Sequence, residues 1–371
     1  MSIGSMVHSA NTTKKRVVCG PSKLNRFVAQ GMQPALDKYT PAWWTNEHIQ
    51  ILLTFVVPQT CVEFQREILA LLDGGQASLD WAVASDTRCA RQDLPADAPI
   101  VVILHGLTGS SVDMQSLCAE ALEHGYRPVV FNKRGHGGVK LTTPVLQGFG
   151  CVDDLKLAVA HIERAFPLAK LYGVGTSAGS GLLCSYLGST GDQSRIRAGV
   201  MISPGYNTFD LFCKGLVKPL YNFLMTRSLQ TFLRQHQDEL RGSIDVDAAL
   251  SATSIQEFDE HVYMKMHGHA DIVEYWKHNN PIRELDRAAR PILCINALDD
   301  PVCTKESIPM DIFESNPERM LVETERGSHC AFYQGKGNWS LENWSDGAAL
   351  TYLDRVRAFE RLEAANEVAA A

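Results

Sequence analysis

Long apolar runs are missing from this sequence. Its longest apolar stretches, such as residues 51–57, are far shorter than the roughly 20 residues that a membrane-spanning helix needs. The chain also opens without the apolar core of a secretory signal peptide. We therefore expect a cytoplasmic protein, with peripheral contact to a membrane surface as the alternative.

A surplus of positive charge is missing as well. The 35 Lys and Arg residues are outnumbered by 42 Asp and Glu residues, which gives a formal net charge of −7. Such a chain has no general attraction for a polyanion, so we expect no nucleic acid partner, and we predict no obligate protein partner. No acidic residue precedes Asp37. We interpret residues 1–40 as a flexible N-terminal extension, with contact to an anionic membrane as the alternative.

Paired cysteines of the Cys-x-x-Cys type are also absent. The ten cysteines are scattered over the whole chain, and several of them, such as Cys184 and Cys294, stand within apolar runs. This pattern favours free, buried thiols in a reducing compartment over a disulfide framework. The ten positions are 19, 61, 89, 118, 151, 184, 213, 294, 303 and 330.

One short motif, His267-Gly268-His269-Ala270-Asp271, copies the start of a binuclear metal-hydrolase pattern. It lacks the further adjacent histidine of that pattern and lies in a polar segment rather than at the end of a strand. Ligand spacing alone gives many false positives. We interpret the motif as a solvated turn, and we predict no metal and no other cofactor.

Short apolar runs alternate with amphipathic segments from residue 99 onward. The runs are continuous, as in strands buried on both faces, and the order strand-helix-strand predicts a mostly parallel sheet with helices on both faces. Before them, residues 63–84 predict a hairpin that turns at Asp73-Gly74-Gly75. The predicted strands are residues 99–104, 127–132, 168–174, 198–203, 291–296 and 320–324, and the predicted helices are residues 115–123, 153–165 and 181–187.

The strand pattern stops between Pro204 and Arg290. This stretch is polar and helical in pattern, with scattered aromatic residues. We interpret residues 206–290 as a helical cap inserted into a core formed by residues 41–205 and 291–371. Because ligands of open α/β sheets bind outside the carboxyl ends of the strands, we expect the cap to cover that edge.

The most informative motif is Gly175-Thr176-Ser177-Ala178-Gly179, which stands between a predicted strand and a predicted helix. A Gly-x-Ser-x-Gly sequence in that context forms a sharp turn that lifts the serine out of the sheet. The sequence therefore predicts an α/β-hydrolase fold with Ser177 as the nucleophile.

A nucleophilic serine needs a general base, and the base needs a carboxylate that orients it. In this fold the chain order is serine, acid, histidine. His329 stands in a loop after the last predicted strands, and Asp299 and Asp300 follow the strand at 291–296. We favour Asp300 because Pro301 fixes the loop directly after it. Asp299 is left as the alternative.

Acyl transfer also needs N–H groups that stabilise the developing oxyanion. The residue after the nucleophile, Ala178, supplies one such group in this fold. The loop that starts at His105 follows an earlier strand, and we expect the N–H of Leu107 to be the second donor. We expect His105 to hold this loop through hydrogen bonds rather than to move protons.

From about Trp43 to about Ala358, the chain resembles the α/β-hydrolase-domain lipase and esterase family that includes medium-chain fatty acid ethyl ester synthase/esterases and certain eukaryotic phospholipases. The resemblance implies that Ser177, Asp300 and His329 form the triad, and that fatty acyl esters such as acylglycerols are the substrates. Two departures are Gly327-Ser328-His329, where the family often has Gly-Gly-His, and the absence of the N-terminal membrane anchor of many eukaryotic relatives. The shared motifs are Asn46-Glu47-His48-Ile49-Gln50, Asp73-Gly74-Gly75, Leu79-Asp80-Trp81, His105-Gly106-Leu107-Thr108-Gly109-Ser110, Phe131-Asn132-Lys133-Arg134-Gly135, Asn296-Ala297-Leu298-Asp299-Asp300-Pro301 and His329 with Phe332.

The sequence as a whole predicts a serine carboxylic-ester hydrolase that acts on a lipid-like ester without a cofactor. Two alternatives are left open. One is an alcohol acyltransferase that uses the same three residues, and the other is a non-catalytic ligand-binding member of the fold. Three intact residues of the triad type disfavour the second alternative, because binding alone does not need them.

Overall fold

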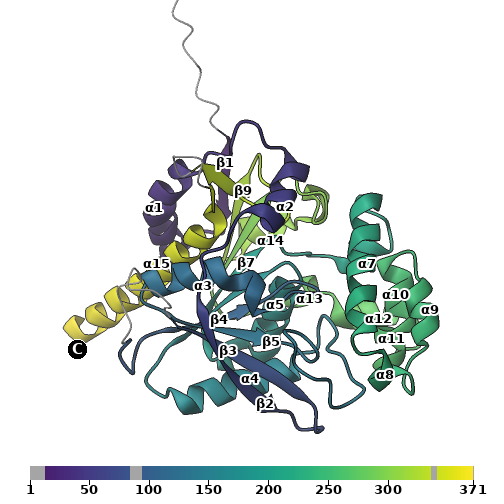
Figure 1. Ribbon diagram of the computed structural model, residues 1–371. Coiled ribbons are helices and arrows are strands. Elements are labelled where there is room, and N and C mark those ends of the chain that lie inside the picture. The colour runs from purple at the N-terminus through teal and green to yellow at the C-terminus, as the bar shows by residue number, and fades with distance from the viewer. Residues whose placement is uncertain (1–12, 84–93, 336–340, 371) are drawn as a thin grey trace, which may run out of the picture.

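The structure is a computed structural model that describes residues 13–83, 94–335 and 341–370. Figure 1 shows a twisted central sheet with helices on both of its sides and a lobe of helices beside it. This architecture is the mostly parallel α/β fold that the sequence predicts. Of the sequence-based expectations, those on residues 1–12 and on Cys89 lie outside the described residues.

The central sheet has nine strands in the order β1-β9-β8-β7-β6-β4-β5-β3-β2. The strands from β9 to β5 in this order run parallel, whereas β1, β3 and β2 extend the two edges in antiparallel pairs. The strands are β1 (Lys15–Cys19), β2 (Glu63–Ala70), β3 (Gln76–Val83), β4 (Ile100–Leu104), β5 (Arg127–Asn132), β6 (Leu171–Thr176), β7 (Ile196–Ile202), β8 (Ile292–Ala297) and β9 (Arg319–Thr324), and β10 (Tyr333–Gly335) and β11 (Leu341–Asn343) form a separate pair.

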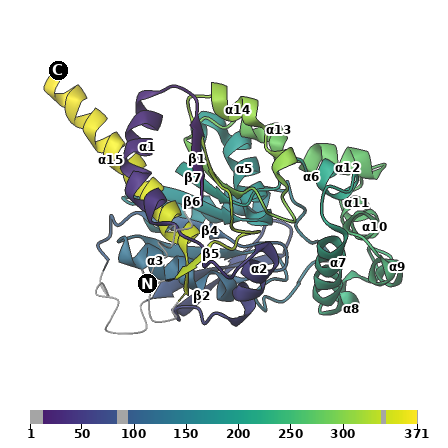
Figure 2. The same cartoon turned by 90° about the horizontal axis from the view of Figure 1, so that it is seen from above.

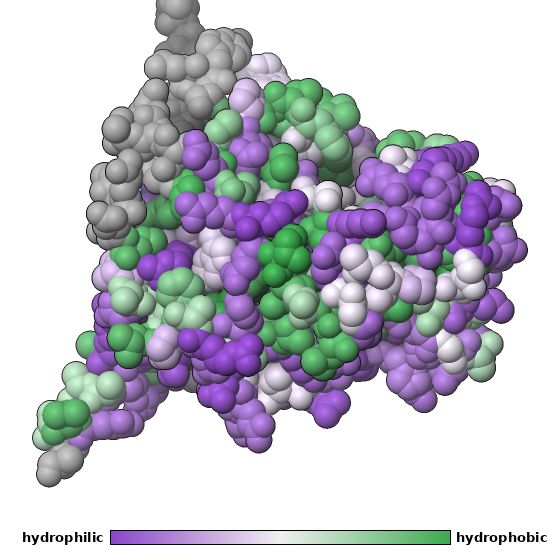
Figure 3. Space-filling view, turned by 60° about the horizontal axis from the view of Figure 1, so that its bottom comes forward, coloured by the Kyte–Doolittle hydropathy of each residue, from purple (hydrophilic) through white to green (hydrophobic). Residues whose placement is uncertain are grey.

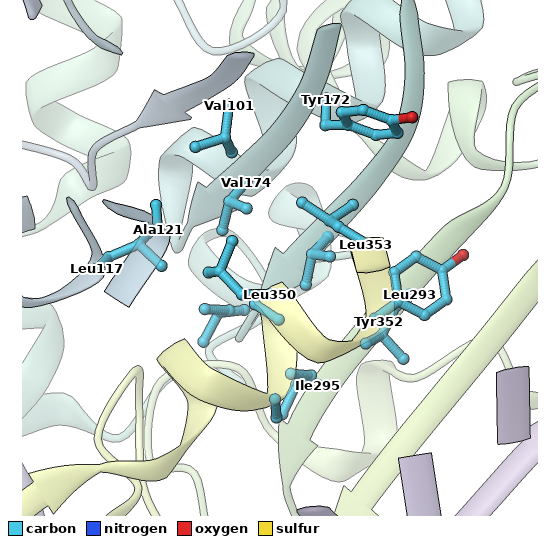
Figure 4. Packing of buried hydrophobic residues seen from close by; sticks show 14 of the residues in the cluster. Val101, Leu117, Ala121, Tyr172, Val174, Leu293, Ile295, Leu350, Tyr352 and Leu353 are labelled. Atoms are coloured by element: carbon cyan, nitrogen blue, oxygen red, sulfur yellow. The ribbon is translucent and has the colours of Figure 1, made fainter. Parts of the chain in front are cut away.

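Two apolar layers hold helices against the two faces of the sheet. One layer joins the sheet to α1, α3 and α15, and the other joins it to α4, α5, α13 and α14. In Figure 4, Leu350 and Leu353 of α15 point toward Val174 of β6 and Ile295 of β8. The helices of this core are α1 (Lys23–Lys38), α2 (Glu47–Val56), η1 (Ser111–Met114), α3 (Gln115–Glu123), α4 (Asp153–Ala165), α5 (Ala178–Thr190), η2 (Gly191–Gln193), α13 (Ile282–Leu285), η3 (Lys305–Ser307), α14 (Met310–Ser315) and α15 (Trp344–Ala370).

The described part of the N-terminal segment is folded onto the sheet. Strand β1 pairs with β9 along its whole length, and α1 buries Val28, Met32 and Leu36 in the same layer as α15 (Figure 2). The prediction of a flexible extension is therefore wrong for residues 13–40. The signal that was missed is the spacing of four between these three apolar residues, which is typical of one face of a helix.

A helical lobe lies between β7 and β8 in the chain and has an apolar core of its own. Residues of loops that follow sheet strands pack into this core, among them Leu107 after β4, Leu146 after β5 and Val302 after β8. The lobe therefore covers the carboxyl ends of the parallel strands, where the sequence places the cap. Its helices are α6 (Thr208–Phe212), α7 (Pro219–Arg234), α8 (Gln237–Leu240), α9 (Val246–Ser251), α10 (Ile255–His261), α11 (Tyr263–Met266) and α12 (Ile272–Asn279).

The cap ends earlier than residue 290, the boundary that the sequence analysis gives. Helix α13 packs against α5 rather than against the cap. Leu285 and Ala288 belong to the apolar layer of the sheet. We therefore place the end of the cap after α12, because residues from 281 onward contact the core.

The molecular surface mixes polar and apolar residues. Figure 3 shows one face, on which hydrophilic residues dominate the cap at the right and a group of hydrophobic residues lies at the upper edge of the view beside it. No helix in the described part of the chain is both long enough and apolar enough to cross a membrane. Eight of the described cysteines are free thiols: Cys19, Cys118, Cys151, Cys184, Cys213, Cys294, Cys303 and Cys330.

Candidate active site

The turn between β6 and α5 places Ser177 at the carboxyl end of the central strands. Ser177 has a φ of 51° and a ψ of −119°, a strained backbone conformation that non-glycine residues rarely adopt. Side chains at Gly175 and Gly179 would collide with neighbouring backbone atoms, so the turn can pack this tightly only with glycine at both positions. The hydroxyl group of Ser180 further ties the turn to the carbonyl oxygens of Gly175 and Ile202.

The structure brings three of the sequence-predicted site residues into one hydrogen-bonded chain. The Oγ atom of Ser177 lies 2.8 Å from Nε2 of His329, and Nδ1 of the same ring lies 2.9 Å from Oδ2 of Asp300. The other carboxylate oxygen of Asp300 accepts the N–H groups of Val302 and Cys303, at 2.7 and 2.9 Å. With its Nδ1 proton directed at a carboxylate, the imidazole presents Nε2 as an acceptor to the serine hydroxyl.

Asp299, the alternative orienting residue, does not contact the histidine ring in this arrangement. Its Oδ2 atom accepts the N–H of Gly327 at 3.3 Å, and its Oδ1 atom has no partner among the described residues. Burial raises the pKa of Asp299 to about 7, and the charges of Glu47 and Asp300 act in the same direction. The geometry therefore favours Asp300 over Asp299, in agreement with the argument from Pro301.

Helix α2 holds the loop that carries His329. The hydroxyl of Ser328 donates to the carbonyl oxygen of Glu47 at 2.6 Å, and the side chain of Gln50 bonds both the N–H and the carbonyl of Tyr333. Asn46 begins this helix by accepting two backbone N–H groups. The motif Asn46–Gln50 thus acts as a support for the histidine loop.

The two expected oxyanion donors belong to segments that lie next to Ser177. Ala178 is the first residue of α5, where N–H groups have no partner within the helix. A Cβ atom added at Gly106 would lie 3.7 Å from Cβ of Ser177, so the loop that carries Leu107 passes close to Ser177. His105 is buried, and its Nδ1 lies 2.9 Å from the carbonyl oxygen of Gly106. This contact suits the structural role that the sequence analysis assigns to His105.

Two further strained residues border the site, and sequence reasoning missed both. Ser203 and Cys330 have φ values of 49° and 56°, and together with Ser177 they are the non-glycine residues with positive φ in the described chain. The N–H of Cys330 donates to Oγ of Ser203 at 2.9 Å, which ties the residue after His329 to the end of β7. Such strain persists only where surrounding contacts impose it, and it clusters at functional sites. Local sequence carries no signal for it.

The histidine-rich motif of the cap does not come together as a metal site. His267 contacts the carbonyl oxygen of Leu146, and Asp271 caps α12. His269 instead lies near Glu274 and His278, with potential ligand atoms within 4.8 Å of one another at a partly exposed position. A second group of this kind, Asp300, Cys303 and His329, overlaps the hydrogen-bonded chain at Ser177.

A cavity of about 450 Å³ opens beside the loop that carries Leu107, between that loop and α7 of the cap. Ser177 and His329 do not line it. The residues that line it are mostly polar or glycine: Arg66, Thr108, Gly109, Ser110, Ser111, Val112, Gly135, His136, Gly137, Gly138, Ser228, Thr231, Phe232 and Gln235.

The fold places the Ser177 turn, the His329 loop and a helical cap at the carboxyl ends of a mostly parallel sheet. Residues 99–336 match the α/β hydrolase fold family. The chain belongs to this family.

Among characterised relatives, the chain is similar to the phospholipase ABHD3 of Bos taurus, with 33% identity over 357 residues that cover 94% of this chain and 84% of the relative. It is also similar to the human protein ABHD15, with 34% identity over 94% of this chain and 75% of that protein. The human monoacylglycerol lipase ABHD2 is 26% identical over 92% and 85% of the two chains.

Among solved structures, puromycin hydrolase matches 79% of this chain and 39% of its own length, with 17% identity and a TM-score of 0.50. At this identity the likeness concerns the fold alone.

Substitution of the two neighbouring aspartates should separate their roles. We expect Asp300→Asn to lower kcat by a factor on the order of 10⁴ with little change in KM, because the amide favours the wrong histidine tautomer. The matched control is Asp299→Asn, which should keep kcat within about tenfold of the wild type. Steady-state kinetics on a short-chain ester measure both. An inactive Asp299→Asn beside an active Asp300→Asn would reverse the assignment.

The raised pKa of Asp299 predicts a pH-dependent effect on stability. Between the usual pKa of an aspartate and about 7, the unfolded chain loses a proton that the folded chain retains, so stability falls as pH rises through this window. Asp299→Asn removes this loss. The melting temperature of the variant relative to the wild type should therefore increase from pH 4 to pH 7.5. A difference in melting temperature that stays constant from pH 4 to pH 7.5 would contradict the raised pKa of Asp299.

Proposed function

We propose that this protein is a serine hydrolase that cleaves carboxylic esters of lipid-like substrates through an acyl-enzyme on Ser177. The observation that supports this proposal most strongly is the chain of hydrogen bonds from Ser177 through His329 to Asp300. A serine, a base and an orienting acid within hydrogen-bond distance make up the arrangement that activates a hydroxyl group for nucleophilic attack.

The proposed reaction begins when Nε2 of His329 takes the proton of Ser177 and Oγ attacks the ester carbonyl carbon. The N–H groups of Leu107 and Ala178 would stabilise the resulting oxyanion, each by about 3 kcal/mol as in comparable sites. The imidazolium, stabilised by Asp300, then gives its proton to the departing alcohol, which leaves the acyl group on Ser177. Water attacks this ester with His329 again as the base, and the acid product and free serine result.

The names of the relatives and the apolar interior of the cap support the proposed substrate class. The relatives are named as a phospholipase and a monoacylglycerol lipase, and the cap places an apolar cluster over the carboxyl ends of the strands. Leu107 and Ile51 of the α/β domain are partly buried and pack against this cluster. These features support fatty acyl esters as substrates, with medium-chain acylglycerols as the first group to test.

Two alternatives use the same site. An alcohol acyltransferase would share the acyl-enzyme and differ only in whether an alcohol rather than water attacks it. A non-catalytic binding role would need no hydrogen bond between Ser177 and His329, so the 2.8 Å contact disfavours it. Product analysis with and without added ethanol separates hydrolysis from transfer.

Peripheral contact with a membrane stays a prediction. Large apolar side chains that could support it are exposed on α2 and on the turn before it, with exposed fractions of 80% for Trp43 and 81% for Phe55. Leu52 and Val56 lie on the same helix and are exposed as well. Because α2 holds the histidine loop through Ser328, a membrane contact at this helix would lie close to the site.

The nucleophile can be tested by substitution and by labelling. Ser177→Ala should keep the fold and lose nearly all turnover of fatty acyl esters, because only the oxyanion donors and substrate binding remain. A fluorophosphonate probe should label the wild type at Ser177 and leave this variant unlabelled. The matched control is Ser185→Ala, which removes a buried hydroxyl of α5 that does not bond the turn and keeps the proposed nucleophile. Ser177→Ala turnover within about tenfold of the wild type would exclude Ser177 as the nucleophile.

A further inference from the structure

Lys133, which follows β5, reaches the loop that carries the expected oxyanion donor. Its Nζ atom lies 3.5 Å from the carbonyl oxygen of Gly106 and 3.4 Å from that of Leu107. Burial lowers the pKa of Lys133 to about 8, with no carboxylate acting against it among the described residues. At neutral pH the amine is therefore mostly charged, and its contacts are with backbone carbonyl groups.

The carbonyl of Gly106 and the N–H of Leu107 belong to the same peptide group. A trans peptide directs its oxygen and its N–H in opposite directions, and the described chain contains no cis peptide bond. A group that holds the oxygen therefore fixes the direction of the N–H. A cation at the oxygen also polarises the peptide and makes its N–H a stronger donor.

The histidine beside Lys133 cannot replace it. Nδ1 of His136 lies 2.9 Å from the carbonyl oxygen of Arg134, and Nε2 lies 3.2 Å from that of Leu107. Burial and the charge of Lys133 lower the pKa of His136 to about 3, so the ring is neutral and carries one proton. We place that proton on Nδ1, which makes the shorter contact. Nε2 then has no proton to donate, so Lys133 is the donor to the carbonyl of Leu107.

The other titratable groups around the ammonium leave its charge uncompensated. Burial and the charge of Lys133 hold the pKa of His105 well below its usual value, so this ring is neutral. Its Nδ1 atom shares the carbonyl oxygen of Gly106 with Lys133, at 2.9 Å, but adds no charge there. Nε2 of His236, in the cap, donates to the carbonyl oxygen of Gly135, and the carboxylate of Asp113 in η1 accepts the N–H of Ser110 instead. Lys133 is thus the cation that acts on this loop.

We propose that Lys133 is a positioning residue for the oxyanion hole, whose ammonium group holds the carbonyl oxygens of Gly106 and Leu107 and so directs the N–H of Leu107 toward the oxyanion. This inference rests on the proposed serine-hydrolase function. It assigns Lys133 an effect on the transition state, where the oxyanion exists, rather than on substrate binding.

Kinetics of two variants over pH 6 to 10.5 test the proposal. Lys133→Met keeps the length of the side chain and removes the charge. It should lower kcat by about ten- to a hundredfold, less than the 10²- to 10³-fold loss on removal of a whole oxyanion donor, with KM unchanged. In the wild type, kcat should fall several-fold as pH rises through about 8. Lys133→Met should lack this fall.

Lys133→Arg is the conservative variant, because a guanidinium group stays charged above pH 12. It should restore most of kcat and move the alkaline fall beyond the measured range. A Lys133→Met variant with the kcat and the pH profile of the wild type would overturn the proposal, as would a variant that loses only thermal stability. A rise in KM at constant kcat would also overturn it and would assign Lys133 to substrate binding.

Labelling of the wild type with a fluorophosphonate separates this inference from the proposed function. If Ser177 of the wild type is labelled and the Lys133 variants show wild-type kinetics, the inference about Lys133 alone is wrong. If the wild type is neither labelled nor active, the proposed function itself is wrong.

Discussion

The close approach between the start of α5 and the ends of β4 and β6 is the constraint on which the site depends. Any side chain at Gly179 would overlap the carbonyl oxygen of Leu104, and one at Gly175 would overlap the backbone of Gly179. This packing bends the chain so sharply that Ser177 must adopt a positive φ. The strain is maintained by surrounding hydrogen bonds, including that from the N–H of Ser177 to the carbonyl of Ile202.

Two loops are then positioned around this fixed serine by different means. The loop with His329 is held by two hydrogen bonds. One joins Ser328 to Glu47 of α2, and the other joins the N–H of Cys330 to the hydroxyl of Ser203. The loop with Leu107 is held by a network of buried polar side chains. In this network the carboxylate of Asp80 accepts the hydroxyl of Ser111, and the side-chain oxygen of Asn132 accepts the N–H of Ser111. Many residues of the motifs that the chain shares with the lipase and esterase family therefore position the two loops and do not take part in the reaction themselves.

The cap contributes to the same support. His236, which follows α7, contacts the carbonyl oxygen of Gly135 at 2.9 Å, and Phe232 packs against His136 with tilted rings whose centres lie 4.3 Å apart. The segment that carries Lys133 is thereby packed between the sheet and the cap.

Much of the fold could be predicted because local patterns encode it. Strand β5 and helix α4 have the predicted bounds, since continuous apolar runs and a stripe of Leu155, Val159 and Ile162 mark them clearly. The pairing of β1 with β9 joins residues about 300 positions apart, so no local pattern announces it. Likewise, the serine turn could be predicted from its glycines, whereas Ser203 is held by contacts with Ile295 and Cys330, which are distant in the sequence.

The choice between Asp299 and Asp300 shows where sequence reasoning reaches its limit. The two side chains are chemically identical, and only the folded loop decides which one meets the histidine. Turn geometry directs Asp300 to the N–H groups of Val302 and Cys303 and to the imidazole. Pro301 indicated this outcome indirectly, because it restricts the backbone between these contacts.

Mass spectrometry of the protein mixed rapidly with a p-nitrophenyl ester of a medium-chain fatty acid tests the acyl-enzyme most directly. A nucleophilic Ser177 predicts a transient mass increase equal to one acyl group, located on the peptide that contains Ser177, and its decay at the rate of turnover. Hydrolysis of the ester without any acylated protein at the earliest times, or with the acyl group on another residue, would contradict the proposed mechanism.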